Sequence, residues 1–128
     1  MSMDLKYLLF STVLCFVQVL IAAATANQQV GLFTLAGNRE IMPEFKGIAG
    51  RAKRAHLNMI ENLVLFATLV LIATVAGKAN ATTALGAAIF FWARLAYAGI
   101  YLAGLPWLRT GAWFVSVIGM IMIAVQLF

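Results

Sequence analysis

The chain has 128 residues, of which 64% are hydrophobic and 10% are charged, and its mean hydropathy is +0.98. A soluble domain of this size needs far more polar surface to cover its core, so the composition argues against a soluble protein and indicates one that lies in membrane lipid. The net charge of +5 is concentrated in a few segments, so we expect no nucleic-acid partner.

Four apolar stretches are each long enough to cross the hydrocarbon core of a bilayer, which takes about 20 helical residues. They cover residues 5–26, 57–76, 83–103 and 108–128. The connections at 78–80 and 104–106 are short, so each of the last three helices is expected to run antiparallel to its neighbour. The sequence therefore predicts an all-α, integral membrane, antiparallel four-helix bundle, with residues 1–128 as a single domain.

Lysine and arginine residues gather at one end of this predicted bundle. The basic residues on that side are Arg39, Lys46, Arg51, Lys53, Arg54 and Arg109, and those on the other side are Lys6 and Lys78. Cytoplasmic loops of membrane proteins carry an excess of lysine and arginine. We therefore expect the long loop, residues 27–50, to be cytoplasmic and both termini to lie on the opposite side.

The second predicted helix must carry polar residues into the membrane. Its purely apolar run, residues 63–76, would span only about 21 Å at 1.5 Å per residue, so the helix needs a polar start from residue 51. At about 100° per residue, five polar side chains of this start share one face of the helix. They are Arg51, Arg54, Asn58, Glu61 and Asn62. Such a stripe cannot face lipid.

The third predicted helix carries a complementary set of polar side chains. Arg94, Tyr97 and Tyr101 are spaced so that they share one face. Arg94 and Glu61 reach a similar depth from the same side of the membrane. Because an unpaired charge at that depth costs several kcal/mol, the sequence predicts a buried Glu61–Arg94 ion pair.

Two interpretations of these polar side chains stay open. The pair of charges could serve only to lock the second helix to the third. Alternatively, Arg51, Arg54 and Arg109 converge on one side with Asn58, and arginine forks suit carboxylates, which favours a site for a small, polar, anionic ligand. We expect no metal at this site.

Two linked motifs resemble those of a known family of membrane proteins. The sequence RAKRAHLNMIEN at 51–62, followed by ARLAYAGIY at 93–101 and PWLRT at 106–110, is similar to the MAPEG family, the membrane-associated proteins of eicosanoid and glutathione metabolism. The chain departs from some members at Asn62, where they have tyrosine. The resemblance implies a homotrimer that binds glutathione between neighbouring protomers, near the cytoplasmic side.

The resemblance also implies a role for each polar residue. Glutathione would act as a co-substrate, and the residues that hold it would be Arg51, Arg54, Asn58, Glu61, Arg94, Tyr97 and Tyr101. Arg109 would face the thiol as the catalytic residue and favour the thiolate, which is the nucleophile. The implied function is that of a membrane glutathione transferase or peroxidase, which attacks an apolar electrophile or hydroperoxide that arrives from the lipid.

Two other functions fit parts of the sequence. A non-enzymatic lipid-binding protein or accessory subunit of a membrane complex would use the polar stripe for structure alone. A small four-helix drug exporter would use a single membrane carboxylate, here Glu61, for proton coupling. The neighbouring arginines should keep Glu61 ionised, which argues against proton exchange.

Overall fold

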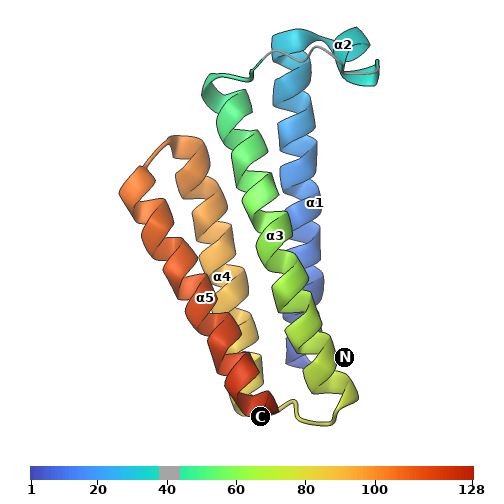
Figure 1. The fold of residues 1–128 in the computed structure, drawn as a ribbon, viewed down its shortest axis with the longest axis vertical. Helices are drawn as coiled ribbons and strands as arrows, with labels where there is room; N and C mark the ends of the chain where they lie inside the picture. Colours follow the sequence, from blue (N-terminus) through green and yellow to red (C-terminus); the bar gives the residue numbers. More distant parts are fainter. Residues whose placement is uncertain (38–43) are drawn as a thin grey trace.

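The structure, a computed structural model, describes residues 1–37 and 44–128. The described residues form five α-helices: α1 Met3–Val30, α2 Leu32–Ala36, α3 Gly47–Val75, α4 Ala81–Ala103 and α5 Pro106–Leu127. The four long helices lie side by side in an antiparallel bundle, with both termini at one end and α2 at the other (Figure 1). Each of the four is long and apolar enough to cross a membrane. The predicted all-α, four-helix membrane fold is confirmed.

The segment predicted as one long loop, residues 27–50, is partly helical. Helix α1 continues to Val30, α2 follows at once, and α3 begins at Gly47. Gly31 separates α1 from α2 with a φ of 85°, a backbone conformation that side-chain-bearing residues rarely adopt. Arg39, one of the basic residues used to orient the chain, lies outside the described residues.

Side-chain hydrogen bonds hold the helix ends together at both ends of the bundle. At one end the Gln29 amide donates to the carbonyl of Lys46 and accepts from its N–H, both at 3.0 Å, which ties α1 to the start of α3. At the other end Asn80 and Thr83 form a capping box at the start of α4. The Asn80 amide also donates to Gln126 Oε1 at 2.9 Å, which joins the start of α4 to the end of α5.

The interior of the bundle changes character along its length. Toward the termini it holds a large apolar cluster, in which the rings of Phe66 and Phe90 stack with centroids 3.9 Å apart, although Asp4, Ser11 and Thr83 are also buried in this half. Other side chains buried in this cluster are Met59, Val70, Ala87 and Ile123. Toward the α2 end the core consists of Ala55, Tyr97 and Tyr101. Among the described residues, the buried arginine and the two buried tyrosines, Arg94, Tyr97 and Tyr101, lie in the half of the bundle nearer α2.

Helices α4 and α5 make the closest contact in the bundle, at two facing glycines. A Cβ atom added to Gly86 would lie 2.6 Å from the carbonyl oxygen of Gly119, and a Cβ added to Gly119 would lie 2.6 Å from that of Gly86. Small residues allow membrane helices to pack backbone against backbone in this way.

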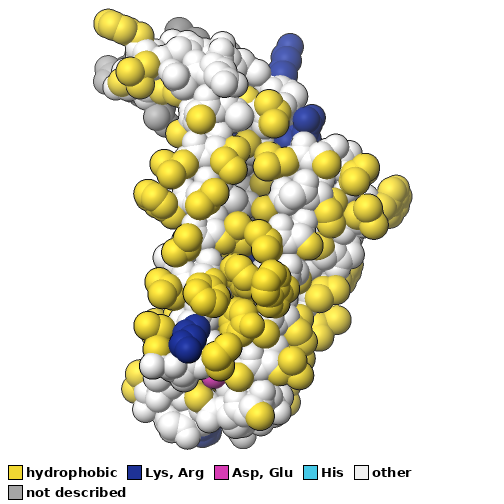
Figure 2. All heavy atoms as spheres, turned by 180° about the vertical axis from the view of Figure 1, so that it is seen from behind, with side chains coloured by type: hydrophobic (Ala, Val, Ile, Leu, Met, Phe, Trp, Pro, Cys, Tyr) yellow, Lys and Arg dark blue, Asp and Glu magenta, His cyan; other side chains and the backbone are white. Residues whose placement is uncertain are grey.

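The outer surface of the bundle is apolar over most of its length. Figure 2 shows hydrophobic side chains spread along one face, with lysine and arginine side chains toward the two ends. Phe16, Leu65, Trp92 and Ile121 are examples of large apolar side chains that point outward. This surface fits a lipid environment.

Candidate functional site

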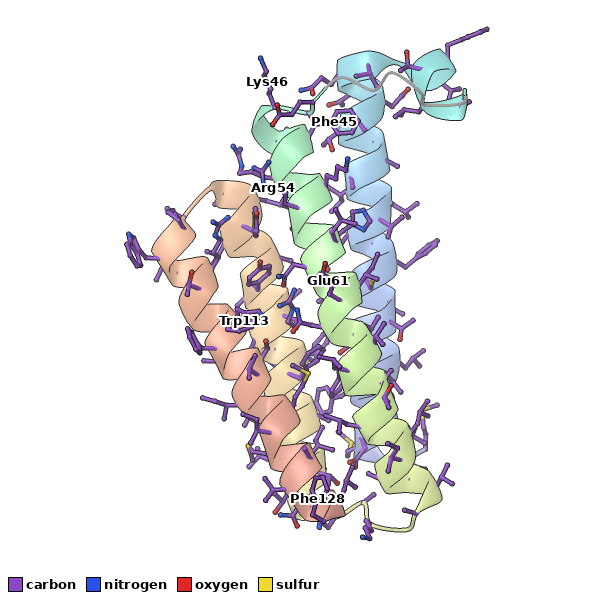
Figure 3. All side chains as sticks on the ribbon, viewed as in Figure 1. Phe45, Lys46, Arg54, Glu61, Trp113 and Phe128 are labelled. Atoms are coloured by element: carbon purple, nitrogen blue, oxygen red, sulfur yellow. The ribbon has the colours of Figure 1, made fainter. Side chains whose placement is uncertain are left out.

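A cleft of about 220 Å³ opens between α3, α4 and α5 in the half of the bundle nearer α2. It is lined by Asn58, Tyr97, Tyr101, Arg109, Thr110 and Trp113. Four of these residues are site residues predicted from the sequence, and they come from three different helices. Figure 3 shows Arg54 and Glu61 on α3 and Trp113 on α5, the helix that forms the opposite wall.

Tyr101 contacts two arginines at this cleft. The guanidinium of Arg109 stands over the Tyr101 ring at 4.4 Å from the ring centroid. Arg54 Nε donates a hydrogen bond to the Tyr101 hydroxyl at 3.2 Å. Because the hydroxyl oxygen accepts from Arg54, the hydroxyl proton is available to a ligand. Two cations therefore lie around one ring, an arrangement suited to an anion.

The local sequence explains why these groups meet. Tyr97 and Tyr101 are one helical turn apart, so both point from α4 toward the same side. Gly104, with a φ of 79°, ends α4 in a left-handed conformation, and Pro106 starts α5 two residues later. This tight reversal brings Arg109, in the first turn of α5, back over Tyr101.

Arg94 lies beneath the cleft rather than in its wall. Only 1% of its surface is exposed, and its Nη2 donates to Asn58 Oδ1 at 2.8 Å. Its guanidinium also stands over the Tyr97 ring, 4.1 Å from the centroid. Nε and Nη1 of Arg94 are buried without a hydrogen-bond partner. Arg94 thus contacts two residues of the cleft without lining it.

The predicted Glu61–Arg94 ion pair is wrong. Glu61 is exposed, and within residues 1–37 and 44–128 it forms no hydrogen bond or ion pair. Arg94 instead donates a hydrogen bond to the side-chain amide of Asn58, which lies almost one turn closer to the α2 end of α3. Because the two α3 positions differ by about 60° around the helix axis, Asn58 faces α4 while Glu61 points away.

Arg51 is also outside the cleft. Its Nε donates to the carbonyl oxygen of Leu102 at 3.0 Å, in the last turn of α4. A cation that bonds a free carbonyl at the C-terminal end of a helix satisfies that acceptor and interacts favourably with the helix dipole. The contacts of Arg51 are therefore those of a helix cap.

Three further residues belong to the site and were not among the predicted ligands. Asn62 Nδ2 donates to the backbone oxygen of Asn58 at 2.8 Å and to its Oδ1 at 3.3 Å. Thr110 and Trp113 line the cleft next to Arg109. The available signals were the spacing of four residues between the two asparagines and between Arg109 and Trp113, which puts each pair on one helix face.

A larger cavity, of about 470 Å³, lies between α1, the chain before α3 and α3 itself. Its walls are mostly apolar, with Lys53 and His56 as the polar members, and the predicted site residues do not line it.

Among the described residues, no group of three or more His, Cys, Asp or Glu side chains could hold a metal ion. The polar groups that line the cleft are a guanidinium, an amide and hydroxyls.

A model of the MAPEG family matches residues 7–128, which include all four long helices and every residue that lines the cleft. Comparison with individual curated sequences gives no match.

Proposed function

The chain belongs to the MAPEG family, whose members are membrane proteins of eicosanoid and glutathione metabolism, and from this premise we propose that it is a membrane glutathione transferase or peroxidase. One observation carries the proposal: the guanidinium groups of Arg54 and Arg109 both engage Tyr101 at a cleft that also exposes the Asn58 amide. Glutathione is an anionic peptide, and these groups match its carboxylates and its thiolate.

The mechanism follows from the character of these side chains. Arg54, Asn58, Tyr97 and Tyr101 bind and orient the peptide, and Arg109 faces the sulfur. A free thiol has a pKa of about 8.5, so it is mostly protonated at neutral pH. A guanidinium beside the sulfur stabilises the anion, and each 1.4 kcal/mol of that stabilisation lowers the thiol pKa by about one unit. The thiol proton leaves to solvent at the cleft mouth.

The thiolate then reacts with an apolar substrate that enters from the bilayer. In the transferase reaction the sulfur forms a bond to an electrophilic carbon, and the leaving group departs with the bonding electrons. In the peroxidase reaction two glutathione thiols are oxidised to the disulfide while the hydroperoxide is reduced to an alcohol and water. The apolar outer surface of the bundle gives such substrates direct access from lipid.

The same proposal includes a homotrimer with the long loop on the cytoplasmic side, each protomer being a single domain. Two features support a second copy at the site. The cleft of about 220 Å³ is smaller than the range of roughly 300–1,000 Å³ typical of small-molecule sites. Glu61 is a carboxylate exposed on a membrane helix, where an unpaired charge is costly. A neighbouring protomer would enlarge the cleft and cover Glu61.

Glu61→Gln tests the subunit contact. We expect the helices of the protomer to stay intact, because Glu61 has no partner within the described part of its own chain. A neighbouring protomer that covers Glu61 must also supply a cation to it, so the trimer should dissociate more readily in Glu61→Gln, since removing one charge of a buried pair costs about 3–5 kcal/mol. Native mass spectrometry over a detergent series measures this, with Glu44→Gln as the control because Glu44 is exposed and precedes α3. A wild-type monomer, or equal trimer stability in both variants, contradicts the proposed assembly.

Titration of glutathione into the purified protein tests the activity. We expect saturable binding by calorimetry together with an increase in the ultraviolet absorbance of the thiolate, since Arg109 should ionise the bound thiol. Turnover with a generic electrophile should follow the same saturation curve. If the protein binds no glutathione, this function is refuted.

The second candidate is a non-enzymatic lipid-binding protein or accessory subunit. The cavity of about 470 Å³ favours it, because its apolar walls with Lys53 and His56 at one side suit an acyl chain that ends in an acidic group. This function predicts displacement of bound lipid without any thiol chemistry. If glutathione fails to bind, lipid binding or an accessory role becomes the favoured function.

A further inference from the structure

The amide of Asn58 is held in one orientation by two donors. Its Oδ1 accepts from Arg94 Nη2 at 2.8 Å and from Asn62 Nδ2 at 3.3 Å. A guanidinium has N–H donors and no acceptor, so the Asn58 atom that faces Arg94 must be the oxygen. This chemistry determines the orientation of the amide, because its oxygen and nitrogen are similar in size and differ in whether they accept or donate.

The orientation of Asn62 is fixed by the same logic. Its Nδ2 lies 2.8 Å from the backbone oxygen of Asn58, which can only accept. Asn62 therefore also presents an N–H to Asn58. Arg94 is 1% exposed and Asn62 is 8% exposed, so water does not compete for these bonds.

Because Oδ1 of Asn58 accepts from Arg94 and Asn62, the amide nitrogen Nδ2 is the atom left to face the cleft. Asn58 lines the cleft, and its Nδ2 bonds to no group in residues 1–37 and 44–128. The other polar groups of the cleft wall are also hydrogen-bond donors. The Tyr101 oxygen already accepts from Arg54, so its proton is free to be donated, and Arg109 has donors alone.

We propose that Arg94 and Asn62 are positioning residues that turn the NH₂ group of Asn58 into the cleft, so that this wall selects a hydrogen-bond acceptor such as a carboxylate or peptide carbonyl. The inference rests on the proposed function for the identity of the ligand, glutathione. The orientation of the amide does not depend on that identity. Neither Arg94 nor Asn62 touches the ligand, and both act through Asn58.

The first experiment compares Asn58→Asp with Asn58→Leu without ligand. Aspartate is close in shape to asparagine and keeps an acceptor for Arg94 and Asn62, whereas leucine leaves both without one. We expect the midpoint of thermal unfolding of Asn58→Asp in detergent to match or exceed that of wild type. The midpoint of Asn58→Leu should fall by about 5 °C or more. Equal losses in the two variants would overturn the proposed orientation.

The second experiment measures glutathione binding to the same variants. In Asn58→Asp a carboxylate oxygen replaces the donor that faces the cleft, so the Kd should rise about tenfold or more even though the protein is folded. A wild-type Kd for Asn58→Asp would show that Asn58 donates nothing to the ligand, and would refute the proposed selection of acceptors.

A double-mutant cycle tests the positioning role of Asn62. Asn62→Leu should raise the Kd by about threefold or more in the wild-type background, yet by less than about twofold in the Asn58→Leu background. A purely structural effect of Asn62 would be the same in both backgrounds. If wild type binds no glutathione, the proposed function fails, and the unfolding comparison alone still decides the orientation of Asn58.

Discussion

Replacing Gly119 with alanine is expected to destabilise the bundle by about 2 kcal/mol or more. The new Cβ would lie 2.6 Å from the carbonyl oxygen of Gly86 and 2.9 Å from the amide nitrogen of Phe90. Both atoms belong to the backbone, so relief requires the whole of α4 to move away from α5. Gly86→Ala should have a similar effect, because its Cβ would lie 2.6 Å from the oxygen of Gly119.

The same two helices supply matched controls for this prediction. Gly99 on α4 and Gly111 on α5 have no atom within 4 Å of an added Cβ. Alanine has the higher helix propensity, so Gly99→Ala and Gly111→Ala should leave stability unchanged or raise it by up to about 1 kcal/mol. Thermal or denaturant unfolding in detergent measures all four variants. Equal shifts at the four positions would show that the close crossing of α4 and α5 does not limit stability.

Arg109→Ala should reduce turnover by about one to two orders of magnitude, which corresponds to about 1.4–2.7 kcal/mol of lost thiolate stabilisation. Glutathione binding should change little, because Arg54, Asn58 and Tyr101 remain in place. The fold should also survive, since the contact that Arg109 makes in the described structure is with the face of Tyr101, which leaves no buried acceptor behind. Initial rates with a generic electrophile and the ultraviolet thiolate signal should fall together.

Two further variants separate the chemistry of Arg109 from its charge. Arg109→Lys keeps the cation but loses the planar group that stacks on Tyr101, so its turnover should lie between those of Arg109→Ala and wild type. Lys53→Ala removes a cation that stands over Phe45, away from the cleft, and should leave turnover unchanged. Wild-type turnover in Arg109→Ala would remove the proposed catalytic role.

Most of the fold could be predicted because lipid imposes simple requirements. A span needs about 20 apolar residues, and the glycine and proline at 104 and 106 mark a reversal. The ends of α1 and α3 nearest α2, residues 27–30 and 47–50, were missed, because hydropathy marks where a helix leaves the hydrocarbon and not where it ends. Polar residues such as Gln29 continue α1 into the aqueous interface, where a helix is still favourable.

The candidate site was predictable in position but not in its pairing. Helical periodicity placed Asn58 and Glu61 on one arc of about 100°, which is correct for a single helix. It cannot say which edge of that arc faces α4, since that depends on how α3 rotates when it packs. In the rotation that α3 adopts, Arg94 donates a hydrogen bond to Asn58, and Glu61 is exposed on the surface of the bundle. Asn62 was placed in the polar stripe but not among the ligand-binding residues, although it bonds directly to Asn58.

The unequal lengths of the helices tie the cleft to the thickness of the bilayer. Helices α1 and α3 have 28 and 29 residues, whereas α4 and α5 have 23 and 22, a difference of about 9 Å at 1.5 Å per residue. Figure 1 shows that α1 and α3 extend past α4 and α5 at the end where α2 lies. The shorter pair is long enough for a hydrocarbon core of about 30 Å, and a bilayer centred on that pair would place the arginines near the cleft at the height of the lipid headgroups. Longer acyl chains would raise the hydrocarbon past Arg54 and Arg109, and hydrophobic mismatch would then oppose the entry of any charged ligand.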